Sequence, residues 1–151
     1  MPIFPTFNGT SRHDPQIDEW FDSRHQDLAA IARLWFAEMR GCGDDVTEVL
    51  HDGHPTACVA DAAFGYVNLF TSHVNIGFFH GAHLEDPAKL LQGSGRWMRH
   101  VKARPGALPS SVPLKALIHA AYADIKDRLA AESDSEWEYL KCGLDRHSSG
   151  Y

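Results

Sequence analysis

The order of hydrophobic patterns along this chain restricts its fold more than any single motif does. Apolar residues recur at helical spacing before residue 40, as in Leu28, Ile31 and Trp35. From residue 46 to residue 101 the pattern changes to short runs of β-branched and aromatic residues between turn-forming residues. An apolar helical stripe returns between Leu114 and Leu129. Helices, then consecutive strands, then a helix predict an α+β domain with an antiparallel sheet rather than alternating βαβ units.

Sequence signals at the ends of the helical regions give their limits. Asp14 suits an N-cap, and Pro15 after it suits the first helical position. A second helix is predicted from about Gln26 to Arg40, before two glycines that stop it. Ser110 or Ser111 is placed to cap a long closing helix.

The central region predicts a small sheet of about five strands, covered on one face by the N-terminal helices and the long C-terminal helix. Asp86 and Pro87 predict a helical turn over Leu84–Leu91, between the last two strands. The predicted strands are Val46–Leu50, Ala57–Ala60, Tyr66–Thr71, Val74–Phe79 and Trp97–Ala103.

The chain divides into three parts. Residues 1–13 are polar with prolines and a glycine, which predicts a flexible arm. Residues 14–131 form the single domain, and residues 132–151 form an acidic C-terminal tail. Within this tail Trp137, Tyr139 and Leu140 are candidates for docking on the core, whereas His147 to Tyr151 are expected to be mobile.

Charge and composition exclude several function classes. The formal net charge of -6 disfavours general nucleic-acid binding through phosphate contacts. A local basic patch is present at Arg96, Arg99, His100, Lys102 and Arg104. No stretch approaches the roughly 18 consecutive apolar residues of a membrane helix, so no membrane contact is expected.

The three cysteines, Cys42, Cys58 and Cys142, are odd in number and far apart. This spacing supports neither a disulfide framework nor a zinc ribbon. The N-terminus shows no charged region followed by an apolar core, as a secretory signal would. We therefore expect a cytoplasmic protein with reduced thiols.

Several short segments together resemble the YdhG-like family, a bacterial group of unknown function also described as frataxin-like. The resemblance covers roughly residues 14–130 and is most specific from 73 to 101. It implies an α+β fold with a small sheet, an intracellular protein, and an iron-chaperone role in iron–sulfur assembly like that of one member. The matching segments are Glu48-Val49-Leu50, Gly53-His54-Pro55, His73-Val74-Asn75-Ile76-Gly77-Phe78-Phe79, Gly81-Ala82, Leu84, Asp86-Pro87, Leu90-Leu91, Gly93-Ser94-Gly95 and Met98-Arg99-His100-Val101.

The segment from Gly93 to His100 is a candidate anion site. Glycines let backbone N–H groups approach a carboxylate or phosphate, and an arginine can bind either through two hydrogen bonds. It is not a Walker loop, because Gly-Lys-Ser/Thr is missing and a strand is predicted to follow. The alternative is a plain glycine turn in which Arg99 pairs with Glu85 or Asp86. The candidate ligand-binding residues are Gly93, Gly95, Arg96, Arg99, His100 and His73.

Two groups of side chains are candidate metal ligands. Asp14, Asp18 and Asp22 are spaced to share one face of a continuous first helix. Carboxylates on such a face bind hard cations only loosely unless they converge. His80 and His83 follow a predicted strand and supply imidazole ligands. The alternatives are a solvated acidic helix face and polar residues in a turn.

No catalytic residues are predicted. His54, His73 and His100 could meet across neighbouring strands as an acid–base group, since histidine titrates near neutrality. However, there is no Gly-x-Ser-x-Gly elbow, and Cys58 falls within a predicted strand. Structural histidines are therefore favoured, and binding is favoured over catalysis.

Three functions stay open from the sequence. The first is an accessory protein that handles iron or a small ligand, iron being implied by the resemblance alone. The second is a pocket protein or enzyme for a small anion at the glycine turn, Arg99 and His100. The third is an interaction domain, since the consecutive Phe78 and Phe79 point to opposite sheet faces. The one outside the core needs cover from a helix, a ligand or a partner chain, as in a homodimer.

Overall fold

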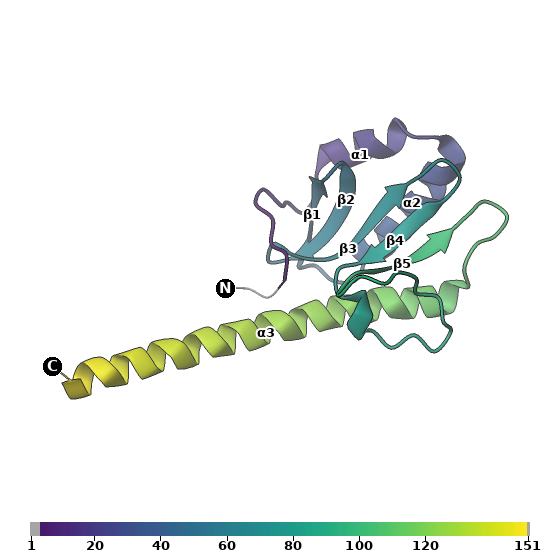
Figure 1. Cartoon of the computed structure of the whole chain (residues 1–151). Coiled ribbons are helices and arrows are strands. Elements are labelled where there is room, and N and C mark those ends of the chain that lie inside the picture. Colours follow the sequence, from purple (N-terminus) through teal and green to yellow (C-terminus); the bar gives the residue numbers. More distant parts are fainter. Residues whose placement is uncertain (1–3, 151) are drawn as a thin grey trace.

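The computed structural model confirms the α+β class. It describes residues 4–150, and side chains over residues 4–134 and at Leu140. Two N-terminal helices precede a run of strands, and one long helix follows them (Figure 1). The elements are α1 (Pro15–Asp22), α2 (Gln26–Arg40), β1 (Val46–His51), β2 (His54–Val59), β3 (Ala62–Leu69), β4 (Val74–Phe78), the short 3-10 turn η1 (Gly81–His83), β5 (Arg99–Ala103) and α3 (Ser111–Gly150).

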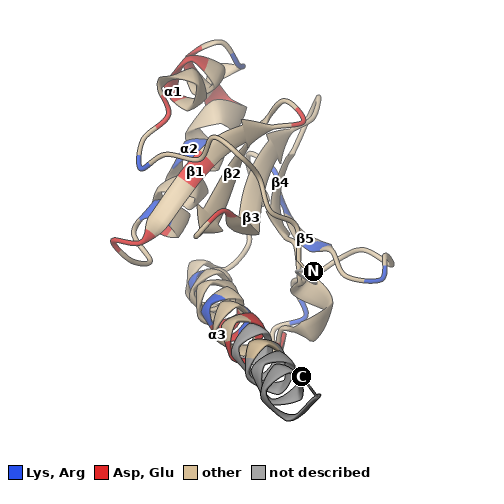
Figure 2. Cartoon of the chain, turned by 90° about the vertical axis from the view of Figure 1, so that its left-hand side faces the viewer, with Lys and Arg blue, Asp and Glu red and all other residues tan. Residues whose placement is uncertain are grey.

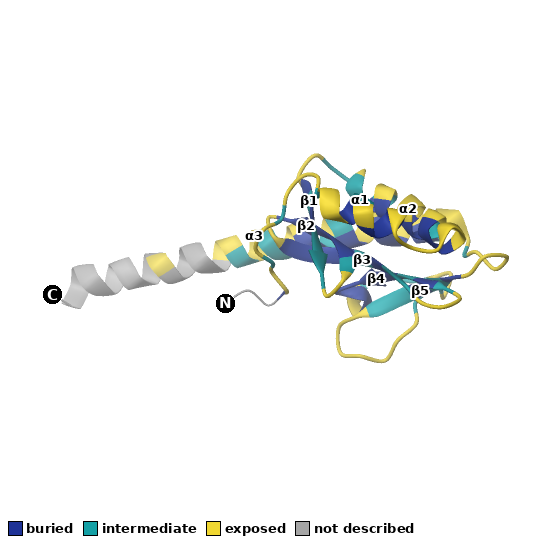
Figure 3. Ribbon diagram, turned by 90° about the horizontal axis from the view of Figure 1, so that it is seen from above, coloured by how far each residue is buried: buried dark blue, intermediate teal, exposed yellow. Residues whose placement is uncertain are grey.

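The five strands form an antiparallel sheet in the order β1-β2-β3-β4-β5, so each strand pairs with the next one along the chain. Successive side chains in a strand point to opposite faces. In β4 this alternation places Val74, Ile76 and Phe78 on the face that packs against the helices. Buried residues accordingly lie along the inner sides of α1 and α2 and in the strands (Figure 3).

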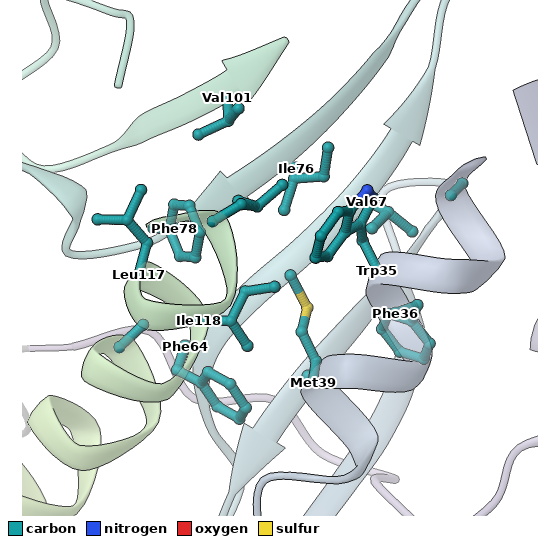
Figure 4. Packing of buried hydrophobic residues seen from close by; sticks show 14 of the residues in the cluster. Trp35, Phe36, Met39, Phe64, Val67, Ile76, Phe78, Val101, Leu117 and Ile118 are labelled. Atoms are coloured by element: carbon teal, nitrogen blue, oxygen red, sulfur yellow. The ribbon is translucent and has the colours of Figure 1, made fainter. Parts of the chain in front are cut away.

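The main core lies between this face of the sheet and all three helices. Phe36 and Met39 of α2 and Leu114 and Ile118 of α3 are almost fully buried, and they meet buried strand residues such as Phe78 (Figure 4). Burying an aliphatic or aromatic side chain of this size contributes about 1.5–3 kcal/mol. The predicted packing of the N-terminal helices and the long C-terminal helix against the sheet is confirmed.

The N-terminal segment covers part of the opposite face. Phe7 donates its backbone N–H to Asp61, and Ser11 exchanges two backbone hydrogen bonds with Glu48. The Phe7 ring stacks on His51 with ring centroids 3.9 Å apart and lies 6.2 Å from Phe79. The described part of the predicted flexible arm is therefore hydrogen-bonded to the sheet. The arm also covers Phe79, through Phe7. The cover was expected to come from a helix, a ligand or a partner chain.

The helical turn predicted over Leu84–Leu91 is absent, and the one helical turn in this region lies earlier, at η1. The cause is local. The Asp86 carboxylate accepts hydrogen bonds from the backbone N–H groups of Leu90 and Leu91, at 2.9 and 2.8 Å. Such side-chain to backbone bonds offer the chain an alternative to helix.

α3 continues through the segment predicted to be a tail. Its side chains reach the core from Leu114 to Leu129. Leu140 is exposed. The side chains of Trp137 and Tyr139, predicted to dock, and those of His147 to Tyr151, predicted to be mobile, lie outside the described residues.

A buried ion pair connects the helices to the first strand. Glu48 of β1 is 1% exposed, and its two carboxylate oxygens accept from Arg40 Nε and Nη2 at 2.6 and 2.8 Å. The same carboxylate accepts the backbone N–H of Asp14 at 3.0 Å. The hydrogen bond to Glu48 raises the pKa of Arg40, so the guanidinium stays charged. One carboxylate therefore joins β1, α2 and the start of α1.

Removing this carboxylate is expected to destabilise the fold strongly. Glu48→Gln leaves the partly buried Arg40 charge with only the more distant Asp18 carboxylate, 3.8 Å away, and should lower the free energy of unfolding by about 3 kcal/mol. Asp22→Asn is the matched control, because it removes the exposed Asp22–Arg33 pair, which should cost less than about 1 kcal/mol. Urea denaturation of both variants measures the difference. Equal losses would contradict this role for the pair.

Candidate anion-binding face of the sheet

The sheet face opposite the helices carries a continuous row of side chains across all five strands. The register aligns Val49 with Thr56, Thr56 with Tyr66, Tyr66 with Gly77, and Gly77 with His100. A parallel polar row pairs Asn68 with Asn75 and Asn75 with Lys102. We call this surface the open face, because the helices cover only the other side.

Tyr66 lies flat on the open face because residue 77 is glycine. A Cβ atom at Gly77 would stand only 2.0 Å from the Tyr66 ring. The ring also contacts His54 and Phe79, with centroids 5.0 and 5.5 Å away. Burial raises the pKa of the Tyr66 phenol and lowers the pKa of His54. The centre of the open face is therefore aromatic and uncharged at neutral pH.

One corner of the open face is basic. His100, Lys102 and Arg104 alternate along β5 and its end, so they point to the same side, and His73 stands directly before β4. We call these four residues the basic corner; Figure 2 shows Lys and Arg at β5 and acidic residues along α1. Within the described part of the chain, neither Lys102 nor Arg104 has an ion-pair partner.

Both imidazoles of the basic corner are neutral at pH 7. Desolvation, followed by the charges of Lys102 and Arg104, lowers the pKa of His73. Desolvation, followed by Lys102 and His73, lowers the pKa of His100. These mutual effects place the four groups within electrostatic reach of one another. A bound anion would reverse the effect of the two cations and favour protonated imidazoles.

Asn75 adds an unsatisfied polar atom beside this corner. Its Oδ1 is buried without a hydrogen-bond partner, and Asn75 is the register neighbour of Lys102. The amide oxygen and nitrogen can exchange positions by rotation, so the same site can offer a donor or an acceptor. A bound ligand would satisfy it.

The structure separates the predicted ligand-binding residues into two groups. His73 and His100 lie in the basic corner. Arg99 pairs with Phe78 in the register and so lies on the other face, where its Nη1 donates to the Gly95 and Met98 carbonyls. Arg96 stacks over Trp97, 4.7 Å from its centroid. Gly93 and Gly95 thus belong to a loop that begins at Gln92, whose backbone pairs with that of His100, and that is held by the Arg99 side chain on the face opposite the His100 side chain.

The predicted metal-ligating histidines have different surroundings. His80 is 7% exposed, and neither ring nitrogen has a hydrogen-bond partner. His83 stacks on Trp97 with centroids 5.5 Å apart. In the part of the chain with described side chains, no three His, Cys, Asp or Glu residues come close enough to hold a metal ion together.

The three predicted carboxylates of the first helix each have a separate interaction. Asp14 caps α1 by accepting from the Gln16 backbone N–H at 3.0 Å. Asp18 is 2.8 Å from His13 and 3.8 Å from Arg40, and Asp22 is 2.9 Å from Arg33. Metal binding at Asp14, Asp18 and Asp22, or at His80 and His83, stays a prediction.

The described cysteines offer no activated nucleophile. Burial raises the pKa of Cys42 to about 11 and that of Cys58 to about 12. Thiols of this kind stay protonated at neutral pH and react slowly. Of the predicted acid–base group, His73 and His100 are near each other, whereas His54 contacts His51 and Tyr66.

Comparisons with protein-family models, curated proteins and solved structures find no match for this chain. Among the described residues, no helix combines the length and apolar character that crossing a membrane requires. The geometry of the open face therefore carries the functional argument.

The contact between Tyr66 and Gly77 can be tested by substitution. Gly77→Ala should destabilise the protein by roughly 2 kcal/mol, because the new methyl group displaces the Tyr66 ring. Gly95→Ala is the control, since no atom lies within 4 Å of the added Cβ, and we expect a change within about 0.5 kcal/mol. In the Tyr66→Ala background, Gly77→Ala should cost much less. Thermal unfolding of the wild type, the three single variants and the double variant checks this, and an undiminished cost would contradict the contact.

Proposed function

We propose that this protein is a binding protein for a small anionic ligand, a carboxylate, sulfate or phosphate compound, held at the basic corner of the open face. Lys102 supplies a point charge, and Arg104 supplies a planar guanidinium that can bind an oxyanion through two hydrogen bonds. His73, His100 and Asn75 add hydrogen-bonding groups around the same position. No step of catalysis is assigned to it.

The observation that carries this proposal is an unneutralised pair of cations on an acidic chain. The chain has 20 acidic and 14 basic residues, yet Lys102 and Arg104 have no acidic partner in the described structure. Several other described cations also have no ion pair. What distinguishes Lys102 and Arg104 is that both stand beside His73 and His100 on one side of the sheet. Cations left without carboxylates on one surface attract anions to it.

The other expectations stay predictions. Membership of the YdhG-like family, iron handling, a cytoplasmic location and a homodimer are supported only by the sequence reasoning given above. The aromatic centre of the open face, where Tyr66 is separated from His100 only by Gly77 in the register, favours anions that carry a planar ring, because such rings stack on tyrosine and histidine.

Neutralising the basic corner should weaken anion binding. Lys102→Gln and Arg104→Gln should each raise the dissociation constant for sulfate about fivefold, since each removes one partly solvated charge contact. Lys115→Gln is the matched control, because Lys115 is an exposed cation on α3. The measurement is an NMR titration in which sulfate replaces chloride at constant ionic strength. Equal effects from all three substitutions would refute a defined site.

An Arg99 variant tells whether the anion binds at the basic corner or at the glycine turn. Because its guanidinium donates to Gly95 and Met98 on the opposite face, Arg99→Gln should leave sulfate affinity unchanged. A larger loss from Arg99→Gln than from Lys102→Gln would place the anion at the glycine turn. The same titration distinguishes the two positions.

Sulfate binding should strengthen on acidification. The pKa values of His73 and His100 lie below 6.5 in the free protein, so both rings gain charge only below that pH. Without ligand the unfolded chain takes up these protons first, and stability should therefore fall as the pH drops below 6.5. Bound sulfate raises both pKa values and opposes this loss. Thermal melts at pH 5.5 and 7.5 should show a larger sulfate-induced shift at pH 5.5; the reverse order would contradict the histidines' role.

A further inference from the structure

A concave site lies on the helical side of the molecule, independent of the open face. It is a groove of about 490 Å³ between α3 and the loop that follows η1. Ala116, Leu117 and Ala120 of α3 form one wall, and Leu84 and Pro87 form the other. Its volume is in the range of pockets that hold small molecules, which are largely apolar with a few polar groups.

The groove has an acidic rim. Four carboxylates line it, from Glu85, Asp86, Asp124 and Asp127. The only cation paired with any of them in the described structure is Arg128, whose Nε is 2.8 Å from Asp124 Oδ2. Asp86 accepts hydrogen bonds from the backbone N–H groups of Leu90 and Leu91. Three negative charges therefore surround an apolar floor without being neutralised.

An unsatisfied imidazole lies behind this groove. His80 lines a small inner cavity, which shares Leu84 and Asp124 with the groove. His80 is 7% exposed, and both ring nitrogens are buried without a hydrogen-bond partner. A buried polar group normally has such a partner, and leaving one without costs stability. Desolvation lowers the pKa of His80, so the ring is neutral and one nitrogen is a free acceptor.

We propose that the groove binds a small aliphatic amine, with its alkyl chain against the alanines of α3 and its ammonium group among the carboxylates without an ion pair in the described structure, Glu85, Asp86 and Asp127. The carboxylates of the rim attract the positive charge and repel anions. The apolar floor favours the alkyl chain over a bare metal cation. The same carboxylates oppose docking of a second copy through this groove, because like charges would meet.

The test is an NMR titration of the whole protein with n-hexylammonium, with n-hexanoate as the control of equal length and opposite charge. Hexylammonium should shift signals of Ala116, Ala120 and Leu84, and hexanoate should not. n-Butylammonium should bind more weakly, by about fourfold for each methylene no longer buried. Equal binding of hexanoate, or no effect of chain length, would overturn the proposal.

Two substitutions locate the amine. Asp127→Asn should weaken hexylammonium binding about fivefold, whereas Asp134→Asn, two turns further along α3 and outside the groove, should leave it unchanged. His80→Phe should raise the melting temperature by removing the unsatisfied imidazole, and it should leave hexylammonium binding nearly unchanged, because His80 lies behind the groove and does not line it. Equal effects of Asp127→Asn and Asp134→Asn would overturn the site.

Discussion

The ion pair between Arg40 and Glu48 sets the arrangement on which the other elements depend. Charged groups of this kind are stable in a protein interior only when paired and hydrogen-bonded. Here one carboxylate binds the last residue of α2 and the N–H of Asp14, and the Glu48 backbone bonds to Ser11. Because few positions satisfy all these contacts at once, the pair fixes the two N-terminal helices and the preceding segment against β1.

The two faces of the sheet then take different roles through simple alternation along the strands. The face with Ile76 and Phe78 is filled by α2 and α3. The other face holds only a small cluster around Phe79, covered by Phe7 and Tyr66. His100, Lys102 and Arg104 stand at the β5 edge of this face, the edge opposite β1. The two candidate sites thus have opposite charge and lie on different layers of the molecule.

Much of the fold was predictable because its signals are local. The limits of α2 match the prediction, since the helical spacing of apolar residues ends at Gly41 and Gly43. The prediction of a helical turn over Leu84–Leu91 was wrong. The Asp86 carboxylate binds the backbone N–H groups of Leu90 and Leu91, and these bonds outweigh the helix preference of the Asp-Pro pair. Sequence reasoning noted Lys102 and Arg104 in a basic patch but grouped them with Arg99.

The candidate sites were harder to predict because they depend on register and tertiary packing. Arg99 and His100 are consecutive residues of β5, so their side chains point to opposite faces of the sheet. A confident prediction of this strand would therefore have separated the two candidate ligand-binding residues. The contact between Tyr66 and Gly77 requires the β3–β4 register, and the burial of His80 requires the position of α3. The positions of these residues in the sequence predict neither the contact nor the burial.

The sequential strand order has a consequence for how the chain folds. Every strand pair forms between neighbours in sequence, which keeps contact order low within the sheet and favours rapid assembly by successive hairpins. α3 comes last in the chain, however, and it covers Phe64 and Phe78. During synthesis the growing sheet therefore exposes an apolar surface until residues 111–129 have left the ribosome, and this interval is when the nascent chain is most exposed to aggregation.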